Sequence, residues 1–354
     1  MTARPLALSL VLLAGPLTGP LTAQEAPDCP DDAAPVVSLG FGSRYAEDSK
    51  SRSDFDEESD KAVTAALKPI DDFIADLARH TDLLNDPETS PELAEAAAAC
   101  VIDSLLPWAQ ADALSDLTTQ GANLSAPSRV GGIAFAYAAV RARQPEAAGN
   151  AEIESWLLAR ARQTMSYFDT EAPPRASQNN LRAWAGLAVT RIGLTLDDPA
   201  LIDWGAASAE RVACTAAADG SLPNEMWRDR LALHYQLHAV GPLVVTAALL
   251  QDRRPDLLAI CDRAILRVVD FTVAALKDPA PVVALTGKTQ SVGGAKPPRD
   301  FELAWASAYL HMAPDAPEVA ALAEAIEKLG NSKLGGDQRL LWPAPLPPAG
   351  PQEG

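Results

Sequence analysis

The sequence lacks the patterns of several common kinds of site. Its four cysteines include no C-x-x-C pair, and its four histidines have no ligand spacing with them, so we expect no structural zinc site. No Gly-x-Ser-x-Gly nucleophile elbow occurs. Gly287-Lys288-Thr289 is similar to the end of a phosphate-binding loop, but Val282 stands where the required upstream glycine would be. The sequence therefore predicts no metal and no other cofactor.

Positive charge is also scarce. The chain has 29 lysines and arginines against 47 aspartates and glutamates, a net charge of -18, which argues against nucleic acid as a partner. A local basic cleft can still outweigh this field within a Debye length of about 10 Å. We therefore expect a groove for an anionic ligand near the three places where basic residues gather: Arg44, Lys50 and Arg52; Arg228 and Arg230; and Lys288, Lys296 and Arg299.

Long apolar runs are missing after the first residues. Residues 1–23 carry an early Arg4, an apolar run from Pro5 to Leu17 and a Leu-Thr-Ala ending, which is typical of a secretory signal peptide cleaved near Ala23. That run is too short to span a bilayer, and no later run approaches the roughly twenty apolar residues that a membrane helix needs. We expect a periplasmic or secreted protein, with an uncleaved anchor as the alternative.

No segment alternates as a strand, whereas helical spacing is widespread, so the sequence predicts an all-α protein. We expect residues 24–342 to form one domain, because no Pro/Gly/Ser linker interrupts them, and residues 343–354 to be a disordered tail. A bundle, a solenoid and a toroid all fit, but no fixed-period repeat supports the solenoid. The expected helices are 62–84, 91–114, 152–165, 181–194, 199–217 and 254–276.

The four cysteines lie in a chain that we expect to be exported, where disulfides are permitted. Four cysteines allow three pairings. We favour Cys29 with Cys100, which would tether the extended N-terminus, and Cys214 with Cys261. The alternative is that Cys214 and Cys261 are buried thiols.

One segment, residues 220–235, carries an arginine and a tyrosine seven residues apart. On a helix this is about two turns, so Arg228 and Tyr235 would point the same way. A cation and a phenol on one face suit chemistry on an acidic sugar. Upstream, Asn179 and Asn180 add neutral donors that could hold a carboxylate.

These segments resemble the alginate lyases of polysaccharide lyase family five. Asn179-Asn180-Leu181-Arg182-Ala183-Trp184 is similar to the family's Asn-Asn-His-x-x-Trp, and residues 220–235 are similar to its Gly-x-Leu-Pro-Asn-Glu with the following arginine and tyrosine. Further landmarks follow in the family's order: Ser43-Arg44-Tyr45 with Arg52, Cys100, the Trp108–Leu114 segment, Asp203-Trp204 and Lys333-Leu334-Gly335-Gly336.

The resemblance implies an incomplete α/α toroid with a central cleft, and cleavage of 1,4-linked mannuronate by β-elimination. The carboxylate beside C5 must be neutralised before a carbanion can form there, and Asn180 and Arg228 are the candidates for that role. Tyr235 is the candidate that takes the C5 proton and protonates the departing O4, with Arg228 lowering its pKa. The candidate substrate-binding residues are Arg44, which replaces a lysine, Tyr45, Asn179, Arg230 and Trp184.

Leu181 is the departure from the family pattern, because the family has a histidine there. Three interpretations stay open: a non-catalytic protein that binds an acidic polysaccharide, a lyase for a related uronate polymer, or compensation by His238, three residues after Tyr235 on the same helical face. A helical scaffold within a polysaccharide export machinery is a further alternative. Trp184 also has a plain interpretation as a core aromatic.

Overall fold

The structure is a computed structural model that describes residues 29, 33–147 and 149–343. Within them, helices dominate, and the only strands are four two-residue segments, so the all-α prediction is confirmed. The expected signal peptide and residues 344–354 of the expected tail lie outside the described part and stay predictions. The strands are β1 (Ser38–Leu39), β2 (Asp116–Leu117), β3 (Gly330–Asn331) and β4 (Gly336–Asp337), with β1 parallel to β2 and β3 antiparallel to β4.

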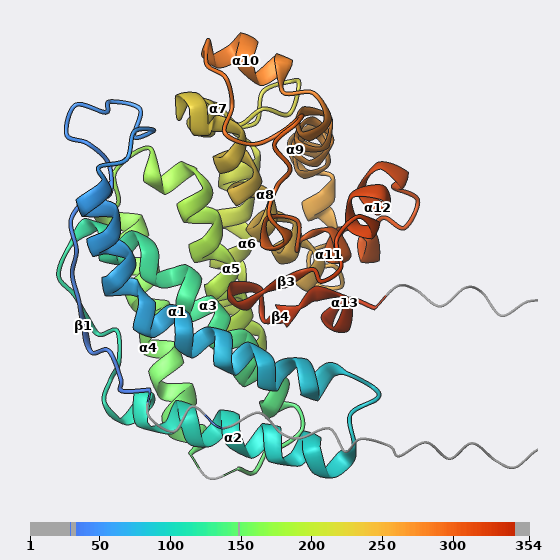
Figure 1. The fold of residues 1–354 in the computed structure, drawn as a ribbon. Coiled ribbons are helices and arrows are strands. Elements are labelled where there is room, and N and C mark those ends of the chain that lie inside the picture. Colours follow the sequence, from blue (N-terminus) through green and yellow to red (C-terminus); the bar gives the residue numbers. More distant parts are fainter. Residues whose placement is uncertain (1–28, 30–32, 148, 344–354) are drawn as a thin grey trace, which may run out of the picture.

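Most helices of the described residues follow one another with short connections (Figure 1), and the longest connection, residues 287–305, lies between α10 and α11. Their bounds are α1 (Glu57–Asn85), α2 (Pro91–Gln110), α3 (Gln120–Arg141), α4 (Asn150–Thr170), α5 (Asn180–Leu196), α6 (Pro199–Ala213), α7 (Pro223–Met226), α8 (Ala232–Leu249), α9 (Ile260–Lys277), α10 (Ala280–Thr286), α11 (Ala306–Met312), α12 (Pro317–Glu324) and α13 (Gln338–Leu341).

The long helices form two layers. Helices α1, α3, α5 and α8 contact one another in that order, and α2, α4, α6 and α9 pack outside them. Figure 1 shows the chain passing from α1 and α2 through α5 to α8 and α9 along an open arc. Helix α5 joins the two largest parts of the core, because Trp184 and Leu187 pack on one side and Val189 and Ile192 on the other. This arrangement holds the first turns of α3, α5 and α8 side by side.

Helices α3 and α8 were missed by the spacing of apolar residues. Both are buried nearly all round, so they carry no polar face that would set off an apolar stripe. Helix α3 contains the buried pair Gly131 and Gly132, which also weakens a helix prediction. Residues 254–259 were wrongly included in one helix with α9: a separate 3-10 turn spans Pro255–Leu258, and Cys261, Asp262 and Arg263 have left-handed φ angles.

Both favoured disulfides are present. Cys29 pairs with Cys100 on α2, and Cys214, just after α6, pairs with Cys261 at the start of α9. The second bond links two neighbouring outer helices, 47 residues apart in sequence. Such links stabilise a fold by restricting the unfolded chain. Among the described helices, none is long and apolar enough to cross a membrane.

Candidate active site

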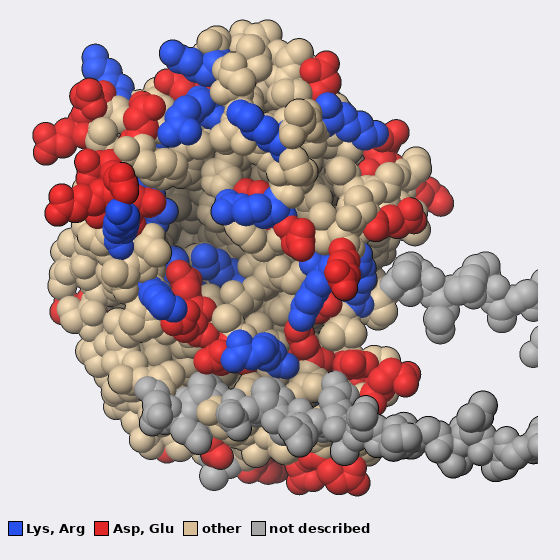
Figure 2. All heavy atoms as spheres, viewed as in Figure 1, with Lys and Arg blue, Asp and Glu red and all other residues tan. Residues whose placement is uncertain are grey.

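A cavity of about 570 Å³ opens at the amino-terminal ends of the inner helices. Its wall comes from the first turns of α3, α5 and α8, from residues 41–52 ahead of α1, and from Arg228 and Lys333. Figure 2 shows this face hollowed, with lysine and arginine side chains in the hollow and around its rim. Helix amino termini carry partial positive charge, so the cavity suits an anionic ligand before any side chain is counted.

The charged side chains of this wall are all basic. Five arginines and lysines line the cavity, and no aspartate or glutamate is among the described lining residues: the five are Arg44, Arg52, Arg129, Arg228 and Lys333. The expected local basic cleft therefore exists in a protein whose net charge is -18. Two members were missed, Arg129 on α3 and Lys333, because they reach the site through the fold and not through a basic run.

Several expected contributors lie elsewhere. Lys50 and the group Lys288, Lys296 and Arg299 are not among the lining residues. Arg230 lies outside the lining too, with its Nε 3.6 Å from Asp54 Oδ1. Arg44 does line the cavity and pairs with Asp60 at 3.3 Å.

Arg228, Tyr45 and Tyr235 form one hydrogen-bonded group on the wall. Arg228 Nη2 donates to Tyr45 Oη at 2.7 Å and to the Arg52 carbonyl oxygen at 2.7 Å, and the Tyr45 and Tyr235 hydroxyls bond each other. The Arg228 guanidinium also stacks on the Tyr235 ring, with its Cζ 3.6 Å from the ring centroid. The predicted pairing of cation and phenol is thus present.

The geometric reason given for that pairing was wrong. Arg228 does not share a helix with Tyr235, because α7 ends at Met226, a 3-10 turn spans Asp229–Leu231 and α8 begins at Ala232. The two meet because the chain turns back over the first turn of α8. The left-handed Gly220 starts this segment, and a Cβ there would lie 2.0 Å from the Arg267 carbonyl oxygen.

The pKa of Tyr235 also departs from the expectation. Burial raises the pKa of its phenol, and although Arg228 lowers it as predicted, burial outweighs that effect. In the free protein the phenol is therefore neutral near pH 7. A phenolate formed there would be a strong base, held against the guanidinium.

The two asparagines at the start of α5 have different surroundings. Asn179 is the N-cap, its Oδ1 accepting from Leu181 N at 3.0 Å, and it does not line the cavity. Asn180 does line it, and its backbone N and its Nδ2 donate to Glu225, with Nδ2 lying 3.1 and 3.0 Å from the two carboxylate oxygens. Its Oδ1 is buried and has no hydrogen-bond partner within the described part of the chain. Glu225 thus fixes the Asn180 side chain.

Glu225 was missed as a site residue, although it lies within the Pro-Asn-Glu part of the segment that was singled out. It is fully buried on α7. Burial raises its pKa to about 7, and the hydrogen bonds from Asn180 and the charge of Arg228 oppose that rise. Its contact with Asn180 joins segments 45 residues apart, which sequence spacing cannot reveal.

Leu181 and His238 both line the cavity. Tyr235 and His238 do lie on one face of α8, with ring centroids 6.2 Å apart. Burial lowers the pKa of His238 to about 3, with smaller contributions from the neighbouring His234 and Lys333, so its ring is neutral at physiological pH. Trp184 lines the same wall, yet it is 5% exposed and its Nε1 donates to the His238 carbonyl oxygen at 3.0 Å. Trp184 therefore fits both interpretations, as a substrate-binding residue and as an aromatic residue of the core.

His234 was missed as a candidate. It lines the cavity, and its Nδ1 lies 2.8 Å from Glu302 Oε1. Although burial opposes it, the hydrogen bonds from His234 and Arg299 lower the pKa of Glu302 to about 2, so this carboxylate is ionised. A carboxylate on one ring nitrogen fixes the orientation of the imidazole. Its position next to Tyr235 in the sequence could have indicated His234 as a site residue.

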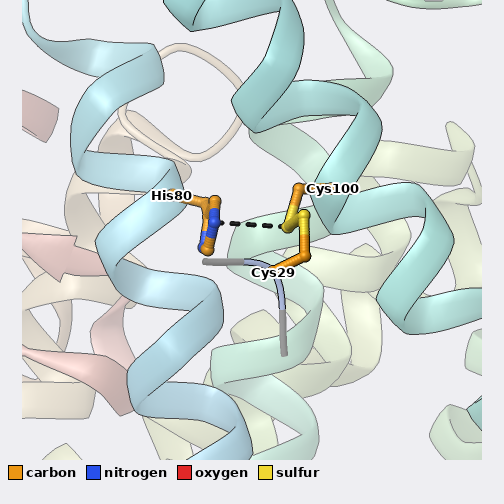
Figure 3. A group of neighbouring side chains, drawn as sticks. All are labelled: Cys29, His80 and Cys100. Carbon is orange, nitrogen blue, oxygen red and sulfur yellow. Dashed lines mark hydrogen bonds between the residues drawn. A yellow bond between two sulfur atoms is a disulfide. The ribbon is translucent and has the colours of Figure 1, made fainter. Parts of the chain in front are cut away.

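One group in the described residues has the composition of a metal site. Cys29, His80 and Cys100 lie together (Figure 3), with His80 Nε2 3.2 Å from Cys100 Sγ. The two sulfurs form the Cys29–Cys100 disulfide, so neither is a thiolate that could bind a metal. This group is a structural tether between the N-terminal segment, α1 and α2.

Known proteins of one family match this chain. The family model described as alginate lyase matches residues 129–282. A polysaccharide lyase from Stenotrophomonas maltophilia (strain K279a) is 33% identical over 283 residues, which cover 78% of this chain and 80% of the relative. An alginate lyase from Cobetia marina is 28% identical over 86% of this chain and 82% of its own length.

Solved structures share the fold. The crystal structure of alginate lyase A1-III from Sphingomonas species A1 matches with a TM-score of 0.71 at 24% identity, over 91% of this chain and 89% of that one. A variant of alginate lyase A1-III with a histidine replaced by alanine, complexed with a tetrasaccharide, matches with a TM-score of 0.75. The predicted α/α toroid is confirmed by these matches. On the 33% identity to a relative covered over 80% of its length, the chain belongs to the alginate lyase family of polysaccharide lyases.

Proposed function

We propose that this protein is an exported lyase that cleaves a 1,4-linked uronate polymer of the mannuronate type by β-elimination, with an altered active site. The observation that carries the proposal is the group formed by Arg228, Tyr45 and Tyr235 on the wall of a cavity lined by basic side chains. Membership of the alginate lyase family supports it. The signal peptide predicted at residues 1–23 supports export to the periplasm.

Recognition of the polymer would rest on its regularly spaced carboxylates. Arg129 is 6% exposed and pairs with Asp71 at 2.7 Å, and Lys333 Nζ lies 3.7 Å from the other Asp71 oxygen. One carboxylate is thus shared by two cations, which leaves net positive charge at the cavity. Burial and Arg129 lower the pKa of Lys333 to about 8, and an incoming uronate would favour its charged form.

Neutralising the carboxylate beside C5 is the next step. Among the described residues, Arg228 Nη1 has no hydrogen bond, and it is the part of the guanidinium free to bind that carboxylate. Asn180 is fixed in place by Glu225, with at least one amide hydrogen committed to that contact. A donor held in position in this way needs no reorganisation when charge develops on the substrate.

Tyr235 would carry the proton. Its phenolate takes the C5 proton, the C5–H electron pair forms the C4=C5 double bond, and the C4–O4 bond breaks as the phenol returns the proton to O4. Arg228 against the ring and the hydroxyl of Tyr45 stabilise the phenolate. Because the pKa of Tyr235 is raised, the phenolate is a minor form at neutral pH, and turnover should rise with pH.

Leu181 removes one polar group from this site, and two histidines face the same cavity. His238 is neutral, because its pKa is lowered to about 3, so it can serve as a hydrogen-bond partner and not as a cation. His234, oriented by Glu302, is the better placed to support charge near Tyr235, since their rings contact at 5.1 Å between centroids. The site therefore keeps imidazole groups despite Leu181.

The test is the absorbance of the unsaturated uronate product during incubation of the mature protein with poly-mannuronate, polyguluronate and glucuronan across a range of pH. We expect a rise on the mannuronate polymer and an initial rate that increases with pH. A flat trace on every polymer, from protein shown to be folded, would contradict the lyase. Saturable polymer binding without turnover would then favour the non-catalytic binding protein, for which the apolar Leu181 in the cavity is the supporting observation.

A further inference from the structure

A second cavity, of about 460 Å³, lies at the opposite ends of the same inner helices. It is lined by the last turns of α3, α5 and α8, by Asn85 at the end of α1, and by His311 and Trp342. Arg191 enters it from α5, eleven residues after Asn180, which is about 16 Å along the helix axis. No residue that the structure describes lines both this cavity and the candidate active site.

Arg191 has no ion-pair partner among the residues that the structure describes. Among the described residues, the guanidinium makes one hydrogen bond, from Nη2 to Thr195 Oγ1 at 3.4 Å, and its Nε is buried without an acceptor. Burial lowers the pKa of Arg191 to about 10, and Asp252, which lines the same cavity, does not contribute to that pKa. The Arg191 side chain is half-buried, with its Nε fully buried, and a cation withdrawn from water without a counter-ion is costly, so the position calls for an anion or another acceptor.

A second buried donor in the same cavity is also without an acceptor. Trp342 Nε1 has no hydrogen-bond partner among the described residues. Its indole lies against His311, with ring centroids 5.5 Å apart, and the Phe135 ring lies 5.7 Å from the Arg191 Cζ. Two orphaned donors, aromatic rings and the amides of Asn85 and Gln251 around one cavity suit a sugar that bears a carboxylate.

We propose that this cavity is a second binding site, remote from the active site, for a uronate residue whose carboxylate is held by Arg191 and whose ring lies against Trp342. Asp252 lines the cavity as well, and the carbonyl ends of α3, α5 and α8 carry partial negative charge. Both disfavour a highly charged ligand such as phosphate and leave a monocarboxylate as the better match. The choice of a uronate among monocarboxylates rests on the proposed function.

The test uses ¹⁹F NMR of the mature protein labelled with 5-fluorotryptophan, in which the seven tryptophans give separate reporters. The Trp342 signal is assigned with Trp342→Phe, and Trp184 reports on the active site. The probes are D-glucuronate and short mannuronate oligomers, with mannobiose as the neutral match. We expect the uronates to shift the Trp342 signal saturably and mannobiose to leave it unchanged.

Arg191→Gln should weaken this response at least tenfold, whereas Arg253→Gln should not. Arg253 is the matched control, since it is half exposed at the same end of the molecule, pairs with Asp197 at 3.0 Å and does not line the cavity. Arg191→Gln removes a half-buried charge that has no ion-pair partner among the described residues, so we expect the variant to fold, which a thermal melt checks.

A Trp342 signal that stays in place while the uronate moves the Trp184 signal would overturn the second site. An equal Trp342 response in Arg191→Gln would overturn it too. Failure of the proposed function looks different: no unsaturated product and no shift of the Trp184 signal, with the Trp342 response to D-glucuronate retained.

Discussion

The two ends of helices α3, α5 and α8 differ in the charge that they place around a cavity. At the amino ends, five basic side chains and the positive ends of the helix dipoles face the same space, together with two hydrogen-bonded phenols. At the carboxyl ends a single arginine, Arg191, faces aromatic rings, Asp252 and helix carbonyls. The amino ends of these helices are therefore suited to stabilising negative charge that develops during a reaction. Their carboxyl ends are suited only to binding an anion.

The polar contacts around the two cavities also differ. Around Tyr235 the groups orient one another: Arg228 bonds Tyr45, Glu225 bonds Asn180, and Glu302 bonds His234. Around Arg191 there are no such side-chain pairs to acidic groups among the described residues, and two donors have no acceptor, whereas at the amino end one buried donor, Arg129 Nε, lacks an acceptor. Preorganised contacts are what catalysis requires, whereas orphaned donors indicate a missing ligand.

Among the charged residues at the amino ends of the helices, we expect substitution of Arg228 to change kcat most. Arg228→Lys keeps the charge but cannot bond Tyr45 and the Arg52 carbonyl together while stacking on Tyr235, so kcat should fall about a hundredfold. Arg230→Lys is the control, because Arg230 lies in the same segment yet outside the cavity, and it should change kcat less than about threefold. Initial rates of double-bond formation provide the measurement. Equal losses in both variants would remove Arg228 from the mechanism.

The variant Leu181→His tests whether the cavity at the amino ends of the helices lacks a polar group that catalysis needs. A donor restored beside Asn180 should help neutralise the substrate carboxylate and raise kcat about tenfold. Leu181→Met, which stays apolar at similar volume, should leave kcat unchanged. If Leu181→His is no faster than wild type, the imidazoles of His234 and His238 already supply what the leucine lacks.

Glu225 gives a smaller effect, on stability. Its pKa is about 7 in the folded protein against 4.5 as the ordinary value, so the native state holds this proton more tightly. Its contribution is complete below about pH 4.5 and is lost as pH rises through 7, which amounts to at most about 3 kcal/mol. Urea unfolding across this pH range should show a free energy of unfolding that falls as pH rises in wild type and not in Glu225→Gln. Glu171 is exposed, so the control variant Glu171→Gln should keep the same pH dependence as wild type. A pH dependence that persists in Glu225→Gln would contradict its assignment to Glu225.

Much of the fold could be predicted from the sequence, because amphipathic helices such as α1 and α6 show their buried face as a stripe. Helices α3 and α8 could not, since they are buried on all sides. In the site, Arg228, Tyr235 and Asn180 were found through the family's motifs. Lys333 was noted only as part of a family landmark and Arg129 not at all, because their place in the site depends on how distant segments pack, and this information lies in no single stretch of sequence.

The most direct test of the account is the initial rate of unsaturated product formation from poly-mannuronate by Tyr235→Phe, beside wild type and Tyr167→Phe. Tyr167 is a buried tyrosine on α4 that does not line the cavity. The account predicts that Tyr235→Phe stays folded, still binds the polymer and loses about a thousandfold in rate, while Tyr167→Phe keeps the wild-type rate. A folded Tyr235→Phe protein that turns over at the wild-type rate would contradict it.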